Sequence, residues 1–137
     1  MSQMTNLYLG ELRTEGIHLL SGNKIITDAP LDNNGKGEAY SPTDLVCSAL
    51  SSCMVTTMGI VAAKENIDLV GMSTEITKIM TSNPRRIAEI IIHVTLPEKK
   101  ILALSDHHKE LLKKTARNCP VALSLHPDIK QILRFNF

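Results

Sequence analysis

Short apolar runs separated by turn-forming residues open this chain and predict β-structure. The runs cover residues 7–9, 17–20 and 24–27, and Ser21-Gly22-Asn23 between the last two indicates a tight hairpin turn. Residues 30–40, which are rich in Asp, Asn and Gly, then predict a loop. We therefore expect the first part of the chain to consist of short strands followed by an irregular segment.

The longest apolar stretch follows this loop and predicts a helix that runs to about Lys64. Ser41 suits the N-cap, Pro42 the first helical position, and Asp44 the closing of a capping box. Residues 45–63 carry no charge, and their length is near the roughly 20 residues of a bilayer span. Because serines and threonines interrupt this stretch and strands flank it, we expect a helix buried on all sides by the rest of the protein, with no membrane contact.

Alternation of apolar and polar positions returns in the second half of the chain. Residues 72–79 and 87–96 predict two strands joined by a turn at residues 81–86. The second strand has these residues inward: Ala88, Ile90, Ile92, Val94 and Leu96. A helix is expected between residues 101 and 118, a short helix at 121–125 and a final strand at 129–137. We interpret residues 1–137 as a single α+β domain.

Composition narrows the classes of function. The formal net charge of +1 gives no reason to expect binding to nucleic acid or to an acidic membrane surface. Three widely spaced cysteines are unlike the dense, even pattern of a secreted disulfide scaffold. Residues 1–6 also lack the basic and apolar regions of a signal peptide. These features favour a reducing, cytoplasmic location.

Two of the three cysteines form a candidate redox pair. Cys119 precedes Pro120 at an expected helix start, where backbone N–H groups would lower the pKa of its thiol and favour the reactive thiolate; a purely capping role is the alternative. Cys53 lies in the middle of the long helix, where a buried cysteine that acts as a small hydrophobe is the alternative interpretation. Cys47 points about 120° away from Cys53 around the helix, so we expect a structural role for it.

Other kinds of site find little support in the sequence. There is no Cys-x-x-Cys pair, and the adjacent His107 and His108 point apart on a helix, so no metal site is expected. The chain has neither the Gly-x-Ser-x-Gly elbow of a serine hydrolase nor a phosphate-binding glycine motif. We therefore expect neither a metal nor an organic cofactor.

The order of these parts resembles that of the OsmC/Ohr family, the osmotically inducible and organic hydroperoxide resistance proteins. The resemblance begins near residue 16 and is carried by the strands, by the helix that contains Cys53, and by three motifs: Ser41-Pro42-Thr43-Asp44-Leu45, Asn83-Pro84-Arg85-Arg86 and Cys119-Pro120-Val121. Within the family, the chain is most similar to the OsmC-like branch. The resemblance implies two antiparallel sheets wrapped around a long central helix in an intertwined homodimer.

The resemblance also implies a function, the peroxiredoxin-like reduction of organic hydroperoxides. Cys53 would be the attacking thiol that becomes a sulfenic acid, and Cys119 would resolve it as an intramolecular disulfide. A dithiol reductant, such as a lipoyl-bearing protein, would then reset the pair. No metal or prosthetic group is needed, because sulfur carries the electrons.

The chain differs from the family's peroxidases at the position of the acidic residue expected beside the attacking thiol. The family's glutamate, ten residues before the cysteine, falls on Thr43 here. Asp44 lies nine residues before Cys53 and so points about 180° away from it on a regular helix. We expect Asp44 to close the capping box instead.

The family's arginine has Arg13 as its candidate, because Arg13 is the only arginine before the long helix. Arg85 and Arg86 lie in the later turn, where a dimer contact or a contact at the rim of the substrate site is expected. A missing cation would weaken the peroxidase activity, since a nearby positive charge stabilises the thiolate. Our alternative hypothesis is a non-enzymatic OsmC-fold module with structural cysteines, which binds a small molecule or senses redox state.

Overall fold

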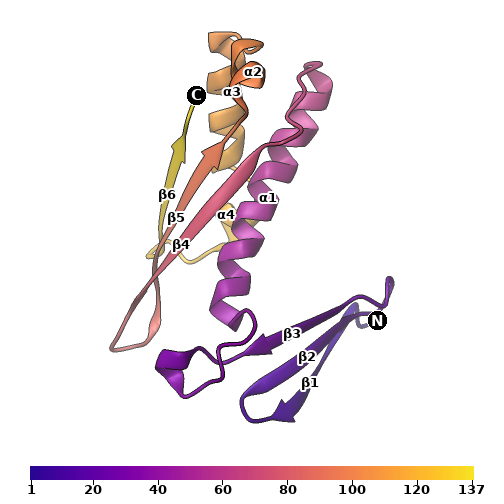
Figure 1. Cartoon of the computed structure of the whole chain (residues 1–137), viewed down its shortest axis with the longest axis vertical. Coiled ribbons are helices and arrows are strands. Elements are labelled where there is room, and N and C mark those ends of the chain that lie inside the picture. The colour runs from indigo at the N-terminus through magenta and orange to yellow at the C-terminus, as the bar shows by residue number, and fades with distance from the viewer. The chain divides into compact units, whose positions relative to one another are not determined.

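The computed structural model describes residues 1–137 and contains two three-stranded sheets together with one long helix (Figure 1). The chain divides into two compact units, Met1–Val46 and Cys47–Phe137, which we call the N-terminal and the C-terminal unit. The elements, in chain order, are β1 (Met4–Gly10), β2 (Arg13–His18), β3 (Lys24–Asp28), the 3-10 turn η1 (Leu31–Asn33), α1 (Pro42–Lys64), β4 (Ser73–Thr81), β5 (Arg86–Thr95), α2 (Glu98–Leu102), α3 (Asp106–Arg117), α4 (Pro120–Ser124) and β6 (Lys130–Phe135).

The N-terminal unit contains an antiparallel sheet with the strand order β1-β2-β3. The predicted hairpin turn between β2 and β3 is confirmed, because the N–H of His18 donates to the carbonyl of Asn23 at 2.9 Å. Gly22 has a φ of +75° in this turn, a conformation that glycine adopts without a steric penalty. The loop that follows is held at its ends by a hydrogen bond of 3.1 Å from the N–H of Asp28 to the carbonyl of Tyr40.

The start of α1 is the capping box that the sequence predicts. The N–H of Ser41 donates to Oδ2 of Asp44 at 2.9 Å, and the N–H of Asp44 donates to Oγ of Ser41 at 3.0 Å. The two side chains thus satisfy backbone groups that the first helical turn leaves without intrahelical partners. Because both residues lie within the same turn, a local sequence motif was sufficient to place this helix start.

The expectation that α1 is buried on all sides is wrong for the single chain. Its buried residues recur every three or four positions and therefore line one face: Cys47, Leu50, Ser51, Met54, Met58 and Ala62. Ile60, on another face, is 54% exposed. The apolar and polar residues of α1 are spread evenly around the helix, so the sequence pattern does not say which of its faces the chain itself covers.

By length and composition α1 is also able to cross a membrane, and 33% of its apolar window is buried in the protein. Core helices of soluble proteins pass the same test. The buried face of α1 is joined to a strand, since the hydroxyls of Ser51 and Thr74 lie 2.7 Å apart. This contact gives the helix a place against the sheet of the C-terminal unit.

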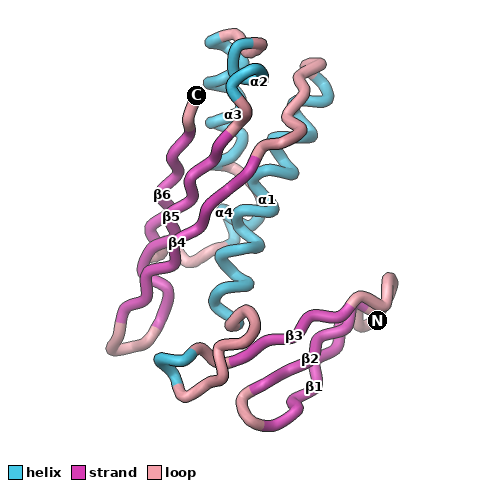
Figure 2. Tube along the Cα trace, viewed as in Figure 1, coloured by secondary structure: helices cyan, strands magenta, loops and turns pink.

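The C-terminal unit contains a sheet with the order β4-β5-β6, and here the expectation of two purely antiparallel sheets is wrong. β4 and β5 pair antiparallel, whereas β5 and β6 pair parallel (Figure 2). The parallel pair arises because β6 returns to the sheet only after α2, α3 and α4. The inward alternation predicted for the middle strand is confirmed at Ile90, Ile92 and Val94, each of which is at most 1% exposed.

The helical segment between β5 and β6 differs in part from the prediction. α3 falls inside the expected range 101–118, and α4 begins and ends one residue before the expected range 121–125. Ser105 caps α3 by accepting the N–H of His108 at 3.1 Å. The five-residue helix α2 was not predicted, because a single helical turn has no periodicity to detect. Leu112 and Ala116 of α3 are fully buried, so this helix completes the core of the C-terminal unit.

Candidate active site

The two cysteines of the candidate redox pair meet within the C-terminal unit. Cys53 lies in the middle of α1 and is half-buried. Cys119 lies at the N-cap of α4 and is 0% exposed. Although 66 positions separate them in the sequence, their side chains lie within hydrogen-bonding contact of each other. The tertiary structure thus creates a dithiol pair, and both thiols are free.

The environment of Cys119 opposes the thiolate that the sequence led us to expect. Burial is the main influence and raises the pKa of the Cys119 thiol, and the adjacent Cys53 raises it further. The backbone N–H groups of Ala122 and Val121 at the start of α4 act in the opposite direction but do not prevail. The expected lowering of the Cys119 pKa is therefore wrong, because loss of hydration outweighs a single turn of helix.

Hydrogen bonds outside the pair hold the two backbone segments in place. Thr57, one turn after Cys53, donates its hydroxyl to the carbonyl of Cys53 at 2.7 Å. Gln131 of β6 donates its amide to the carbonyl of Ala122 in α4 at 3.0 Å. The second bond attaches the short helix that carries Cys119 to the edge of the sheet. No sequence motif marks Gln131, which reaches α4 only because β6 pairs with β5.

The three proposed supporting residues, Arg13, Thr43 and Asp44, all lie in the N-terminal unit, whereas both cysteines lie in the C-terminal unit. Thr43 and Asp44 belong to the first turn of α1, where the Thr43 hydroxyl lies 3.2 Å from that of Ser41. Asp44 has the predicted role in the capping box. The local structure gives Asp44 a structural function that is independent of thiol chemistry.

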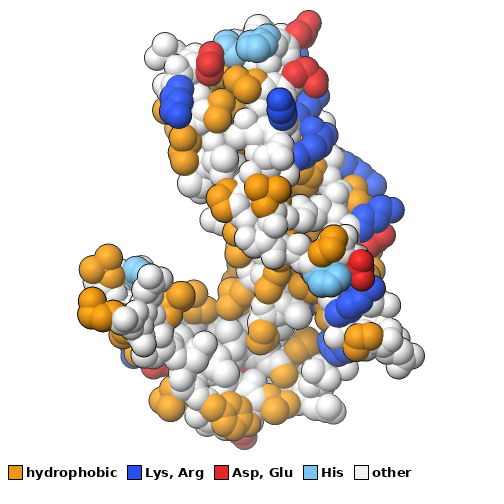
Figure 3. Space-filling view, turned by 180° about the vertical axis from the view of Figure 1, so that it is seen from behind, with side chains coloured by type: hydrophobic (Ala, Val, Ile, Leu, Met, Phe, Trp, Pro, Cys, Tyr) orange, Lys and Arg blue, Asp and Glu red, His pale blue; other side chains and the backbone are white.

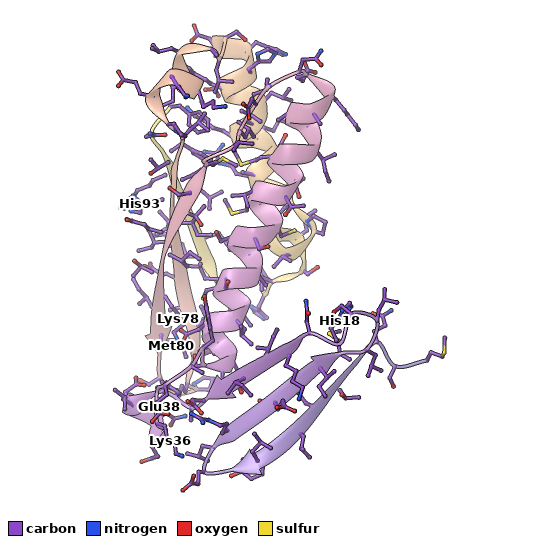
Figure 4. All side chains as sticks on the ribbon, turned by 45° about the vertical axis from the view of Figure 1, so that its right-hand side comes forward. His18, Lys36, Glu38, Lys78, Met80 and His93 are labelled. Carbon is purple, nitrogen blue, oxygen red and sulfur yellow. The ribbon has the colours of Figure 1, made fainter.

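Arg13 is held by two carboxylates within its own unit. Its Nε and Nη2 donate to the two carboxylate oxygens of Asp28 at 2.7 and 2.8 Å, and Nη2 also lies 3.0 Å from Glu38. Asp28 is 1% exposed, and its hydrogen bond with Arg13 lowers the pKa of its carboxyl group. Figure 4 labels Glu38 and Lys36 in the loop that follows β3, and His18 near the opposite end of the same sheet.

Sequence reasoning missed Asp28, although a signal was present. Arg13 and Asp28 are opposite each other in the register of β2 and β3. The sequence placed the turn at residues 21–23, whereas the hydrogen bond from His18 to Asn23 closes it around residues 19–22. With the observed turn, pairing outward along the strands brings Arg13 opposite Asp28 as an ion pair.

The remaining candidates lie away from the thiol pair. Cys47 is 2% exposed in the core, on the buried face of α1. Arg86, which was expected in the turn, is the first residue of β5 and donates to the carbonyl of Ile87 at 3.1 Å. No group of three or more His, Cys, Asp and Glu side chains converges in a way that could hold a metal ion.

Comparison with known proteins finds a matching family and solved structures that share the fold. Residues 35–133 match the family of OsmC-like proteins. A crystal structure from Psychrobacter arcticus 273-4, of a protein described as a candidate osmotic stress induced and detoxification response protein, has 47% sequence identity and a TM-score of 0.93, with 99% of this chain and 96% of that chain covered. Comparison with curated proteins finds no match.

Two more distant structures share the fold. An organic hydroperoxide resistance protein OsmC from Legionella pneumophila has 17% identity and a TM-score of 0.76, with 98% of this chain and 95% of that chain covered. The organic hydroperoxide resistance protein OhrB of Bacillus subtilis has 14% identity and a TM-score of 0.68, with 99% of this chain and 98% of that chain covered. The family match extends over the helix with Cys53 and the segment with Cys119. The chain belongs to the OsmC-like protein family.

Proposed function

We propose that this protein is a thiol-dependent peroxidase that reduces organic hydroperoxides. The observation that carries the proposal is the contact between the thiols of Cys53 and Cys119. A pair at this separation can exchange a sulfenic acid for a disulfide without a large rearrangement of the backbone. The names of the Legionella and Bacillus proteins, both organic hydroperoxide resistance proteins, add support through the shared fold.

The unequal exposure of the two sulfurs supports different roles for them in the proposed reaction. Cys53 is half-buried and accessible to a hydroperoxide, whereas Cys119 is 0% exposed. The Cys53 thiolate attacks an oxygen of the hydroperoxide, the O–O bond breaks, and an alcohol leaves with a proton, so that Cys53 becomes a sulfenic acid. Cys119 loses its proton, its thiolate attacks the sulfenic sulfur, a disulfide forms, and the hydroxide that is expelled takes up a proton and leaves as water. A dithiol reductant, such as a lipoyl-bearing protein, returns two electrons.

The burial of Cys119 makes the second step dependent on pH. Only the thiolate attacks, and burial raises the pKa of the Cys119 thiol above its ordinary value. We therefore expect disulfide formation from the sulfenic acid to become faster as the pH rises from 6 to 9. Stopped-flow measurement of sulfenic acid decay, with a sulfenic-acid-trapping dione as competitor, measures this step apart from the first.

A homodimer is part of the proposal, because each unit leaves apolar surface uncovered. Hydrophobic side chains are exposed across the N-terminal unit (Figure 3), among them Leu7 and Ile25 at 61% and 53% exposure. One side of the β1–β3 sheet borders a hollow of about 440 Å³ that Ile17, Ile25 and Leu45 help to line. A second copy of the chain is the occupant that the intertwined dimer of this family supplies. We place the dimer in the cytoplasm, where thiols are kept reduced.

Mass spectrometry after oxidation tests the proposed function. A few equivalents of cumene hydroperoxide are expected to lower the intact mass by two hydrogens, as one intramolecular disulfide forms. In Cys119→Ser the loss of two hydrogens is expected to disappear, and a sulfenic acid adduct with a trapping dione is expected at Cys53. Cys47→Ser is the matched control, in which the loss of two hydrogens remains.

Two outcomes of the same experiment would contradict the proposed reaction. An unchanged mass, with all three thiols free after exposure to hydroperoxide, would contradict the peroxidase and favour a binding or sensing module. If Cys119→Ser still lost two hydrogens and Cys47→Ser did not, the disulfide partner of Cys53 would be Cys47 and not Cys119.

A further inference from the structure

The two sulfurs of the proposed disulfide are not equivalent toward an external thiol. Cys53 lies on α1 with part of its side chain exposed, whereas Cys119 is 0% exposed. Thiol–disulfide exchange requires the attacking sulfur to reach one sulfur of the disulfide and to expel the other. Access therefore determines which bond to the reductant forms first.

We infer that the reductant attacks Sγ of Cys53 and expels Cys119, so that the mixed disulfide always forms on the helix α1. This inference rests on the proposed redox pair and goes beyond it, because it specifies the direction of the reductive half of the cycle. In the reaction, a thiolate of the dithiol reductant bonds to Cys53 and the Cys53–Cys119 bond breaks. The reductant's second thiol then attacks its own sulfur of the mixed disulfide, leaves as a cyclic disulfide, and releases the Cys53 thiolate.

Burial raises the pKa of the Cys119 thiol and so disfavours it as the leaving sulfur, and the inference rests on the difference in access between the two sulfurs. When the disulfide breaks, the departing thiolate lies beside the N–H groups of Ala122 and Val121 at the start of α4. These groups support the negative charge at the moment of departure, and burial then favours uptake of a proton. The amide of Gln131 keeps α4 attached to β6, so these N–H groups stay aligned with the sulfur. The released thiol remains beside Cys53 and is ready for the next sulfenic acid.

Trapping the mixed disulfide tests the direction of attack. The chain is first oxidised with diamide, so that formation of the disulfide does not depend on peroxidase activity. It is then mixed briefly with cysteamine as a monothiol probe, quenched with acid and labelled with N-ethylmaleimide. Trypsin separates the two sites, because Cys53 lies in the fragment 37–64 and Cys119 in the fragment 118–130. The Cys47→Ala variant leaves Cys53 as the sole cysteine of its fragment.

The expected result is cysteamine on fragment 37–64 and maleimide on fragment 118–130. This pattern should exceed the reverse one, with cysteamine on 118–130 and maleimide on 37–64, by about tenfold or more, because access governs the rate of exchange. Cysteamine mainly on fragment 118–130 would overturn the inference and leave the peroxidase proposal intact. Failure of diamide to form any disulfide between Cys53 and Cys119 would overturn both. As a matched variant, Gln131→Leu is expected to slow the release of Cys119 several-fold without moving the adduct from Cys53.

Discussion

The two units of this protein bury different kinds of side chain. Every buried apolar side chain lies in the C-terminal unit, where Leu50, Ile92 and Leu112 are all 0% exposed. The buried residues of the N-terminal unit are instead polar, namely Thr27, Asp28 and Ser41. The C-terminal unit is therefore stabilised by its own core, whereas the N-terminal unit has little apolar burial to offset the entropy of folding.

The contrast extends to the two clusters of polar side chains, because the thiol pair and the ion-pair cluster lie in different units. The contact between Cys53 and Cys119 requires two helices held firmly by a packed core, and only the C-terminal unit provides one. The N-terminal unit is held by its hairpins, the Arg13–Asp28 ion pair and backbone hydrogen bonds. Its sheet has exposed apolar side chains and no buried ones of its own, which supports the proposed homodimer.

The largest effect is expected from matched truncations of one isoleucine in each unit. Ile92→Ala removes a 0% exposed core side chain and should lower the free energy of unfolding by about 2–5 kcal/mol. Ile25→Ala removes a side chain that is 53% exposed and should change the free energy of unfolding by about 0.5 kcal/mol or less in dilute protein. Urea denaturation measures both. Equal losses at low protein concentration would contradict the contrast between the units.

The next effect concerns the ion pair of the N-terminal unit and its dependence on pH. The hydrogen bond with Arg13 lowers the pKa of Asp28 from its usual 3.8, so the pair adds stability above pH 3.8 that is lost as the pH falls through the lowered value. Asp28→Asn is therefore expected to lower the melting temperature at pH 7 and to flatten its decline in acid.

Glu38→Gln is the matched control for this experiment, because it changes a 66% exposed carboxylate that contacts the same arginine. Its melting temperature at pH 7 should stay close to that of the wild type, because exposed ion pairs contribute little. If the melting temperature of Glu38→Gln fell in acid as little as that of Asp28→Asn, the burial of Asp28 would not explain the effect of the ion pair.

A smaller effect is expected on self-association. Ile25→Glu places a charge on the sheet face that we propose a second copy covers, and should weaken dimerisation by about tenfold or more, or about 1.4 kcal/mol. Leu102→Glu changes an 80% exposed leucine at the end of α2 and should leave association unchanged. Analytical ultracentrifugation measures both constants. Equal weakening by the two variants would argue against the β1–β3 face as the interface.

The smallest effect is expected at the start of α1. Asp44→Asn weakens the capping box and should lower the free energy of unfolding by about 0.5–1 kcal/mol. The rate at which Cys53 reacts with a hydroperoxide should not change, because Asp44 acts through backbone groups. A large loss of that rate at unchanged stability would show that Asp44 takes part in the thiol chemistry.

Features governed by neighbouring residues could be predicted from the sequence. The capping box of Ser41 and Asp44, the turn at Gly22 and the N-cap position of Cys119 each depend on a few consecutive residues. The alternation of Ile90, Ile92 and Val94 likewise indicated the buried face of β5. In these segments, local propensity and the burial pattern favour the same structure.

Features that depend on distant residues became visible only in three dimensions. The parallel pairing of β5 with β6, the single buried face of α1 and the attachment of α4 by Gln131 each join segments that are far apart in the chain. The pKa of Cys119 belongs to the same group, because burial by remote side chains reversed the effect of the local helix start.

Residue order alone therefore established the short-range motifs and named the two sulfurs, since turns, caps and alternation act over a few positions. Their meeting, their unequal exposure and the raised pKa of the buried thiol arose from packing. Packing depends on contacts among residues from all parts of the folded unit, and no short segment of the sequence indicates those contacts.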